Sequence, residues 1–184
     1  AEPAPSEQPT GVSNAVTTAV YKALPYILEE GARWIDERGC VSCHQVPLMV
    51  WSLNAAKTNG FAVPANQLQG HKKWAVRPRS FDALEEGESF QLASALKGNT
   101  DTMSMLLLGL GDDMFAGNGW KIVFSDALIA NQNKNGLWDA CGQLPAQKRP
   151  VAETNRVSSM WVMLALLRQG YRMQEFEPDL MVFK

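Results

Sequence analysis

Apolar residues recur at helical spacing along most of the chain. The longest stripe runs through Val16, Val20, Leu24, Ile27, Leu28, Gly31 and Ile35. Residues three or four positions apart lie on one face of a helix, so this stripe predicts an amphipathic helix, which Pro25 should kink or restart. Residues 120–130 predict a second amphipathic helix. Residues 65–96 are helical by composition, and we expect Pro78 to divide them.

Three segments of eleven residues resemble one another and recur at nearly equal intervals, at 51–61, 105–115 and 161–171. Each begins with a large apolar residue and ends on an aromatic one. In the outer two segments Gly60 and Gly170 precede the aromatic residue, where a glycine with positive φ would end a helix. The middle segment has Met114 at this place and is the weakest match.

Two stretches that overlap these segments, 103–110 and 160–167, have almost no polar face, which is typical of buried helices. We therefore predict an all-α fold of three helical hairpins, with the second helix of each hairpin inside and the first outside. The expected boundaries are a flexible N-terminal segment at 1–11, hairpins at about 12–62, 63–116 and 117–172, and a C-terminal tail at 173–184.

Composition narrows the possible classes of protein. Hydrophobic residues make up 46% of the 184 residues, enough for a core in one domain, and a net charge of −2 gives no basic surface for nucleic acid. No apolar run approaches the ~20 residues of a transmembrane helix. Residues 1–11 are rich in Pro, Ala and Glu, and we expect them to begin a mature chain after removal of a signal peptide. An arbitrary chain boundary is the alternative.

Cys40, Cys43 and His44 form a Cys-x-x-Cys-His motif. Two thiols at this spacing add to the two vinyl groups of haem, and the histidine that follows becomes an axial ligand of the iron. The motif predicts one covalent haem c, with His44 as the proximal iron ligand. Such haem is attached outside the bacterial cytoplasm, so we expect a periplasmic or otherwise exported protein. A thiol redox pair, or a zinc site that includes Cys141, is the alternative.

The residue opposite His44 is left open by the sequence. Met103 and Met105 open the second inner helix, and the hairpin plan places them at the end of the molecule that carries the motif. His71 follows soon after the helix that leaves the motif, so the plan places it at the far end, unless the segment between Phe61 and Trp74 folds back. Cys141 is a weaker candidate. A vacant or water-filled position is the remaining alternative.

Residues 132–138, QNKNGLW, fit the Gln-x-x-x-Gly-x-Trp motif of squalene-hopene cyclases and related terpenoid cyclases. Together with the Cys-x-x-Cys-His segment, this motif resembles bacterial haem-c proteins with a terpenoid-cyclase-like α/α-toroid fold. The resemblance covers most of residues 20–171. The resemblance implies an α/α arc, about half of a toroid, in which Gln132, Gly136 and Trp138 are structural. The acidic Asp-x-Asp-Asp motif of the cyclases is missing, so cyclase activity is not expected.

Two functions remain open. The first is electron transfer by a periplasmic monohaem cytochrome with a redox partner protein. The second is a haem protein with an open or weakly ligated iron, which binds or transforms nitric oxide, carbon monoxide, peroxide or an apolar organic ligand. No paired carboxylates or Ser/His/Asp set at a recognisable spacing indicates an enzyme. An unclosed arc and an apolar tail at 180–183 favour a homodimer. The basic run at 71–79 is either a solvated helix face or a partner for haem propionates.

Overall fold

The computed structural model describes residues 13–41, 44–81, 91–112, 115, 117–141, 148–170, 173–175 and 181–183, the last two ranges by their backbone. The segment 1–11, Cys43 and Met114, which carry predictions made above, lie outside these residues.

The described chain is almost entirely helical, which confirms the all-α class. The α-helices are α1 (Asn14–Arg38), α2 (Gln45–Thr58), α3 (Ala65–Ala75), α4 (Leu92–Lys97), α5 (Thr100–Leu110), α6 (Gly119–Ala130) and α8 (Val151–Arg168). A short 3₁₀-helix, η1, spans Pro78–Phe81. In the expected tail, β1 (Met173–Glu175) pairs with β2 (Met181–Phe183) in a small antiparallel hairpin that periodicity did not predict.

Local chemistry explains where several helices begin and end. Ser13 Oγ accepts a hydrogen bond from Val16 N–H at 3.4 Å and caps α1, which ends at Gly39 with φ 62°. The expected restart at Pro25 is wrong, because α1 continues through it. Pro78 does divide its region, since α3 ends before it and η1 begins at it.

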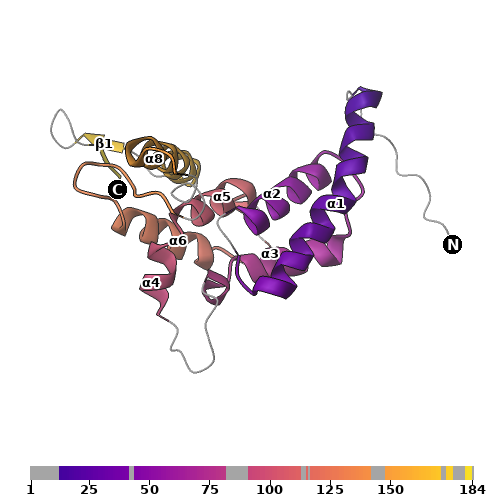
Figure 1. The fold of residues 1–184 in the computed structure, drawn as a ribbon, viewed down its shortest axis with the longest axis horizontal. Helices are drawn as coiled ribbons and strands as arrows, with labels where there is room; N and C mark the ends of the chain where they lie inside the picture. The colour runs from indigo at the N-terminus through magenta and orange to yellow at the C-terminus, as the bar shows by residue number, and fades with distance from the viewer. Residues whose placement is uncertain are drawn as a thin grey trace.

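Three helices form the central layer of the molecule. α5 packs between α2 and α8, and α1 covers the outer side of α2. Figure 1 shows α1, α2, α5 and α8 following one another from one end of the molecule to the other, with α8 beside β1. α6 packs against α4 and α5. The fully buried side chains lie mostly on the three layer helices and α6, and include Leu53, Met103, Leu106, Leu107, Leu110, Phe124, Leu128 and Leu166.

The prediction that the two apolar stretches lie inside is right for most of α5 and wrong for α8. Leu106 and Leu107 on α5 are inaccessible to solvent. On α8, however, Met160, Leu164 and Leu167 are 62%, 52% and 46% exposed. The reason is position, because α5 has a layer helix on each side whereas α8 is the last helix of the layer.

Glycines allow the layer helices to approach closely. A Cβ atom on Gly109 would lie 2.6 Å from Cγ of Trp51, and one on Gly31 would lie 2.8 Å from Cγ of Met49. Such distances are shorter than real Cβ contacts, so side chains at these positions would separate α5 from α2 and α1 from α2. Gly60 and Gly170 have φ of 83° and 87°, which confirms the predicted helix-ending glycines.

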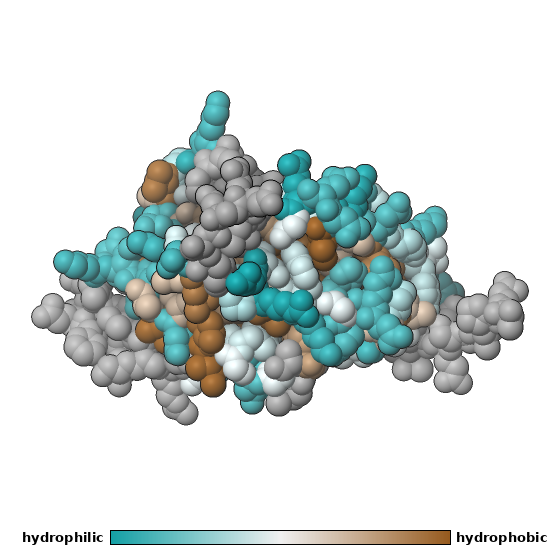
Figure 2. Space-filling view, turned by 90° about the horizontal axis from the view of Figure 1, so that it is seen from below, coloured by the Kyte–Doolittle hydropathy of each residue, from teal (hydrophilic) through white to brown (hydrophobic). Residues whose placement is uncertain are grey.

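Helix length and hydropathy bear on membrane association. Within the described ranges, none of the helices combines the length and apolar character needed to cross a bilayer. The face shown in Figure 2 is mainly hydrophilic, with hydrophobic residues in small groups.

Candidate cofactor site

The loop between α1 and α2 carries Cys40 and His44. α2 begins directly after His44, which is its N-cap residue. Trp34 Nε1 donates a hydrogen bond to the Cys40 carbonyl at 3.1 Å. Val41 is inaccessible to solvent, and its N–H donates to the Ser80 carbonyl at 2.6 Å. The loop is therefore held from α1 on one side and from η1 on the other.

The described side chains of the motif fit covalent haem attachment. Cys40 forms no disulfide and is partly exposed, and the imidazole of His44 is partly exposed as well. A thioether needs a reduced thiol that a vinyl group can reach, and an axial histidine needs an accessible ring nitrogen. Apolar side chains of Val41 and Val46, both buried, flank these two residues.

The zinc alternative lacks support among the described residues. No three His, Cys, Asp or Glu side chains in the described ranges cluster closely enough to hold a metal ion. Cys141 instead contacts Asp101 at the start of α5. Its Sγ and its N–H each donate to Asp101 Oδ2 at 3.3 Å.

The N-terminal ends of the three layer helices lie at the same end of the layer as the motif. Asn99, the N-cap residue of α5, donates from Nδ2 to the carbonyl of Phe81, the residue after Ser80. Cys141 contacts α5 through Asp101, and the preceding Ala140 N–H donates to Asn155 Oδ1 of α8 at 2.9 Å. The hairpin plan placed the segments before α5 and α8 at this end, and these contacts agree with it.

The structure corrects the expected position of His71. α3 packs back along α2, after a turn that includes Gly60. Ser80 Oγ donates to the Trp74 carbonyl at 2.7 Å, and Ser80 O accepts from Val41 N–H. The C-terminal end of α3 is thus tied to the motif loop. His71 lies three residues before Trp74, and its neighbour Lys72 contacts Asn54 of α2, so α3 extends from the motif loop towards the opposite end of the layer.

The environment of His71 is unusual for a histidine. Its Nε2 atom is buried, and no described residue makes a hydrogen bond to it. Burial lowers the pKa of the His71 imidazole below its ordinary value of 6.5, and the Asp36 carboxylate of α1 opposes part of this shift by raising it. Asp36 lies four residues before Cys40, so this interaction also places His71 beside the motif end of α1.

Met103 and Met105 lie in the N-terminal half of α5. Met103 is inaccessible to solvent, whereas Met105 is partly exposed. Residues two positions apart on a helix point to different sides, so at most one of them faces any given site.

The basic run at 71–79 does not form one solvated face. Lys72 is only 3% exposed, and its Nζ contacts Asn54 Oδ1 of α2 and lies 5.7 Å from the ring centre of Phe115. Lys73, Arg77 and Arg79 are exposed. The interpretation as a solvated face is wrong for Lys72, whose ammonium group links α3 to α2.

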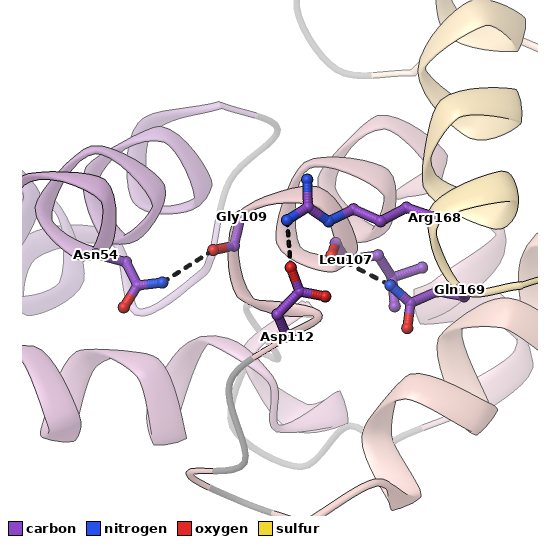
Figure 3. A network of polar contacts seen from close by, with 6 residues as sticks. All are labelled: Asn54, Leu107, Gly109, Asp112, Arg168 and Gln169. Atoms are coloured by element: carbon purple, nitrogen blue, oxygen red, sulfur yellow. Dashed lines mark hydrogen bonds and ion pairs between the residues drawn. The ribbon is translucent and has the colours of Figure 1, made fainter. Parts of the chain in front are cut away.

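A polar network closes the opposite end of the layer. Asn54 Nδ2 donates to the Gly109 carbonyl at 3.1 Å, Gln169 Nε2 donates to the Leu107 carbonyl at 3.5 Å, and Arg168 pairs with Asp112 (Figure 3). The Asn54 contact satisfies a carbonyl group near the end of α5 that lacks a helical partner, whereas the Leu107 carbonyl also accepts from Gly111 N–H at 2.9 Å. A cavity of about 530 Å³ lies here and is bordered by Trp51, Thr58 and Arg168. No sequence motif pointed to it, because its residues come from three distant segments.

Trp138 of the 132–138 segment is buried and joins two helices. Its Nε1 donates to the Leu128 carbonyl at the end of α6, and its N–H donates to Ser159 Oγ of α8 at 2.9 Å. Gln132 Nε2 donates to the Gly136 carbonyl at 2.9 Å, within the same segment. The 132–138 segment therefore makes structural contacts, and the Trp138 side chain links it to the C-terminal end of α6.

Comparison of the chain with protein-family models, with curated proteins and with solved structures gives no match.

Proposed function

We propose that this protein is a monohaem c-type cytochrome that transfers electrons. The observation that carries the proposal is the Cys-x-x-Cys-His motif on a loop held between α1 and η1, with Cys40 outside any disulfide. Cys40 and Cys43 would form the two thioether bonds, and His44 would be the proximal iron ligand. The bound iron would supply a one-electron redox change.

The contacts of the loop prepare it for this role. Trp34 donates to the Cys40 carbonyl, and the Ser80 carbonyl accepts from the Val41 N–H, so contacts with α1 and η1 position the backbone on the N-terminal side of the motif. His44 is fixed on the other side by the start of α2, whose Leu48 N–H donates to the His44 carbonyl at 3.0 Å. A loop fixed at both ends needs little reorganisation between the two oxidation states, which favours electron transfer.

The second candidate function, small-molecule binding at the iron, is favoured by one cavity. A cavity of about 300 Å³ between α1 and α2 is bordered by Gln45, the residue after His44, and by Ile27 and Leu48. The larger cavity of about 530 Å³ lies at the other end of the layer. A ligand-binding cytochrome would need an open iron position beside the smaller cavity.

The finer fold and the cellular location are part of the same proposal. α2, α5 and α8 would be the inner helices of a partial α/α toroid, in which α1 and α6 are outer helices. Covalent haem attachment implies that the chain is exported, so we place the protein in the periplasm with a redox partner protein.

Visible spectra distinguish the two functions. We expect the purified haem protein to be low-spin in both oxidation states, to be reduced and reoxidised reversibly, and to keep its spectrum under carbon monoxide. A high-spin spectrum that shifts with carbon monoxide would replace electron transfer by the ligand-binding function.

A further inference from the structure

We infer that the cavity of about 530 Å³ at the end of the central layer binds a small zwitterion, namely an α-amino acid with an uncharged side chain. This inference goes beyond the proposed function and does not depend on a bound haem. It rests on the cavity, on the ion pair between Asp112 and Arg168 that borders it, and on the helix ends that meet there.

The cavity lies where the three layer helices end. Thr58 and Arg168, the last residues of α2 and α8, border it, and so does Leu108 from the last turn of α5. Its volume is within the range of ~300–1,000 Å³ that is typical of small-molecule sites. The side chains of Arg168 and Asp112 are 47% and 73% exposed, so a ligand can reach both charged groups from solvent.

The ion pair uses only part of its hydrogen-bonding capacity. Arg168 Nη2 contacts Asp112 Oδ2, and no described residue makes a hydrogen bond to Oδ1 of Asp112 or to Nη1 and Nε of Arg168 (Figure 3). An ammonium group can therefore bind Oδ1, while a carboxylate group binds the remaining guanidinium N–H groups. Both groups of an α-amino acid are attached to one carbon atom, so they can bind the two members of one ion pair together.

The end of α5 favours the ammonium group of such a ligand. α5 has no basic residue in its last turn, and its Leu108 carbonyl accepts no hydrogen bond from the described residues. The C-terminal end of a helix carries a partial negative charge, which attracts a cation. The indole of Trp51 also borders the cavity and provides an aromatic surface that a cation can contact.

A ligand with a single charge is less complementary to this site. A simple anion would be repelled by Asp112 and by the end of α5, and a simple cation would be repelled by Arg168. The Lys72 ammonium group contacts Asn54 Oδ1, but Lys72 is only 3% exposed and does not border the cavity. A zwitterion has no net charge, so its binding leaves the charge balance of the site unchanged.

The remaining walls suit an uncharged side chain. Trp51 and Ala55 provide apolar surface, and Thr58 and Asn59 provide polar groups. Apart from the ion pair, the residues that border the cavity carry no charge. Phenylalanine and glutamine therefore represent the two kinds of side chain that the walls accept.

Isothermal titration calorimetry of the full-length protein at low ionic strength, where charges are least screened, tests the inference. Phenylalanine, glutamine or both should bind. For whichever binds, the amine that lacks the carboxylate and the acid that lacks the ammonium group should bind at least about tenfold more weakly, because each loses a charged hydrogen bond. For phenylalanine these analogues are phenethylamine and 3-phenylpropionate.

Variants locate the binding site. Asp112→Asn and Arg168→Gln should each weaken binding by at least about tenfold, and Ala55→Phe should abolish it by filling the cavity. The matched controls are Arg149→Gln and Glu153→Gln, which break an ion pair of similar exposure at the other end of α8 and should keep the wild-type affinity. Circular dichroism checks that each variant is folded.

Three results would overturn the inference. The first is that neither amino acid binds. The second is an analogue with one charge that binds as tightly as its amino acid, which would make the site one for a simple cation or anion. The third is binding that persists in Asp112→Asn and Arg168→Gln, which would place it elsewhere on the protein. A protein without covalent haem would disprove the proposed function and leave these titrations equally decisive.

Discussion

At the scale of single residues, Ser80 connects the loop of the Cys-x-x-Cys-His motif to α3. Ser80 is 4% exposed and uses its side chain for Trp74 and its carbonyl for Val41. This arrangement sets the position of His71 relative to the motif. The sequence could not indicate this contact, since a hydrogen bond between Val41 and Ser80, almost forty positions apart, leaves no local pattern.

Ser80→Ala should reduce stability by about 0.5–1.5 kcal/mol, because it removes the hydrogen bond from the Ser80 hydroxyl to the Trp74 carbonyl, which keeps the Arg77 N–H as its other partner. Urea unfolding followed by circular dichroism measures the change. Ser94→Ala, at an exposed position on α4, is the matched control and should change stability by less than about 0.5 kcal/mol. Equal effects of the two substitutions would show that the Ser80 hydroxyl does not stabilise the contact between η1 and α3.

At the scale of helices, small residues decide how closely the layer packs. Trp51 of α2 lies over Gly109 of α5 and makes an edge contact with Trp161 of α8, at 6.2 Å between ring centres. The absence of a side chain at Gly109 allows a tryptophan to pack across α5. The same contact explains why a glycine interrupts the leucine-rich end of that helix.

Gly109→Ala should therefore destabilise the protein by about 1–3 kcal/mol, because the new methyl group would overlap Trp51. Gly70→Ala on α3 is the control, since a Cβ atom there would meet nothing within 4 Å. It should stabilise the protein by about 0.5–1 kcal/mol through helix propensity. Thermal unfolding of both variants tests the prediction, and a stabilising Gly109→Ala would disprove the close approach of α2 and α5.

Periodicity was a good guide to the helices themselves. The stripes at 16–35 and 120–130 correspond to α1 and α6, and the apolar stretch at 103–110 is the buried α5. The residues that form each amphipathic helix follow from the local spacing of apolar positions, so they can be predicted from the sequence. The return of α3 along α2 and the uncovered face of α8 depend on tertiary packing, which local spacing does not encode.

At the scale of the whole molecule, the central layer ends at α8. Met160, Leu164 and Leu167 lie on one face of this helix and are exposed, and we call them the α8 stripe. α5 shows how such a helix is buried when a neighbour covers each side. A second copy of the chain, packed through the same stripe, would supply the missing neighbour.

Sedimentation at micromolar concentration should therefore show a dimer. Leu164→Glu should shift the protein towards monomer, because it places a charge in the centre of the α8 stripe. Val151→Glu, an exposed position on the opposite side of the same helix, should leave the dimer intact. A wild-type protein that is monomeric at this concentration would show that the stripe is not a self-association surface.

The central claim is that the protein carries a covalent haem. The most direct test is the mass of the intact protein, exported from cells that also express the haem-attachment machinery. The account predicts a mass equal to the chain plus one haem, which acid-acetone does not remove. Cys40→Ala and Cys43→Ala should each weaken this attachment, and the double variant should lose the haem. A wild-type protein with the mass of the chain alone would contradict the account.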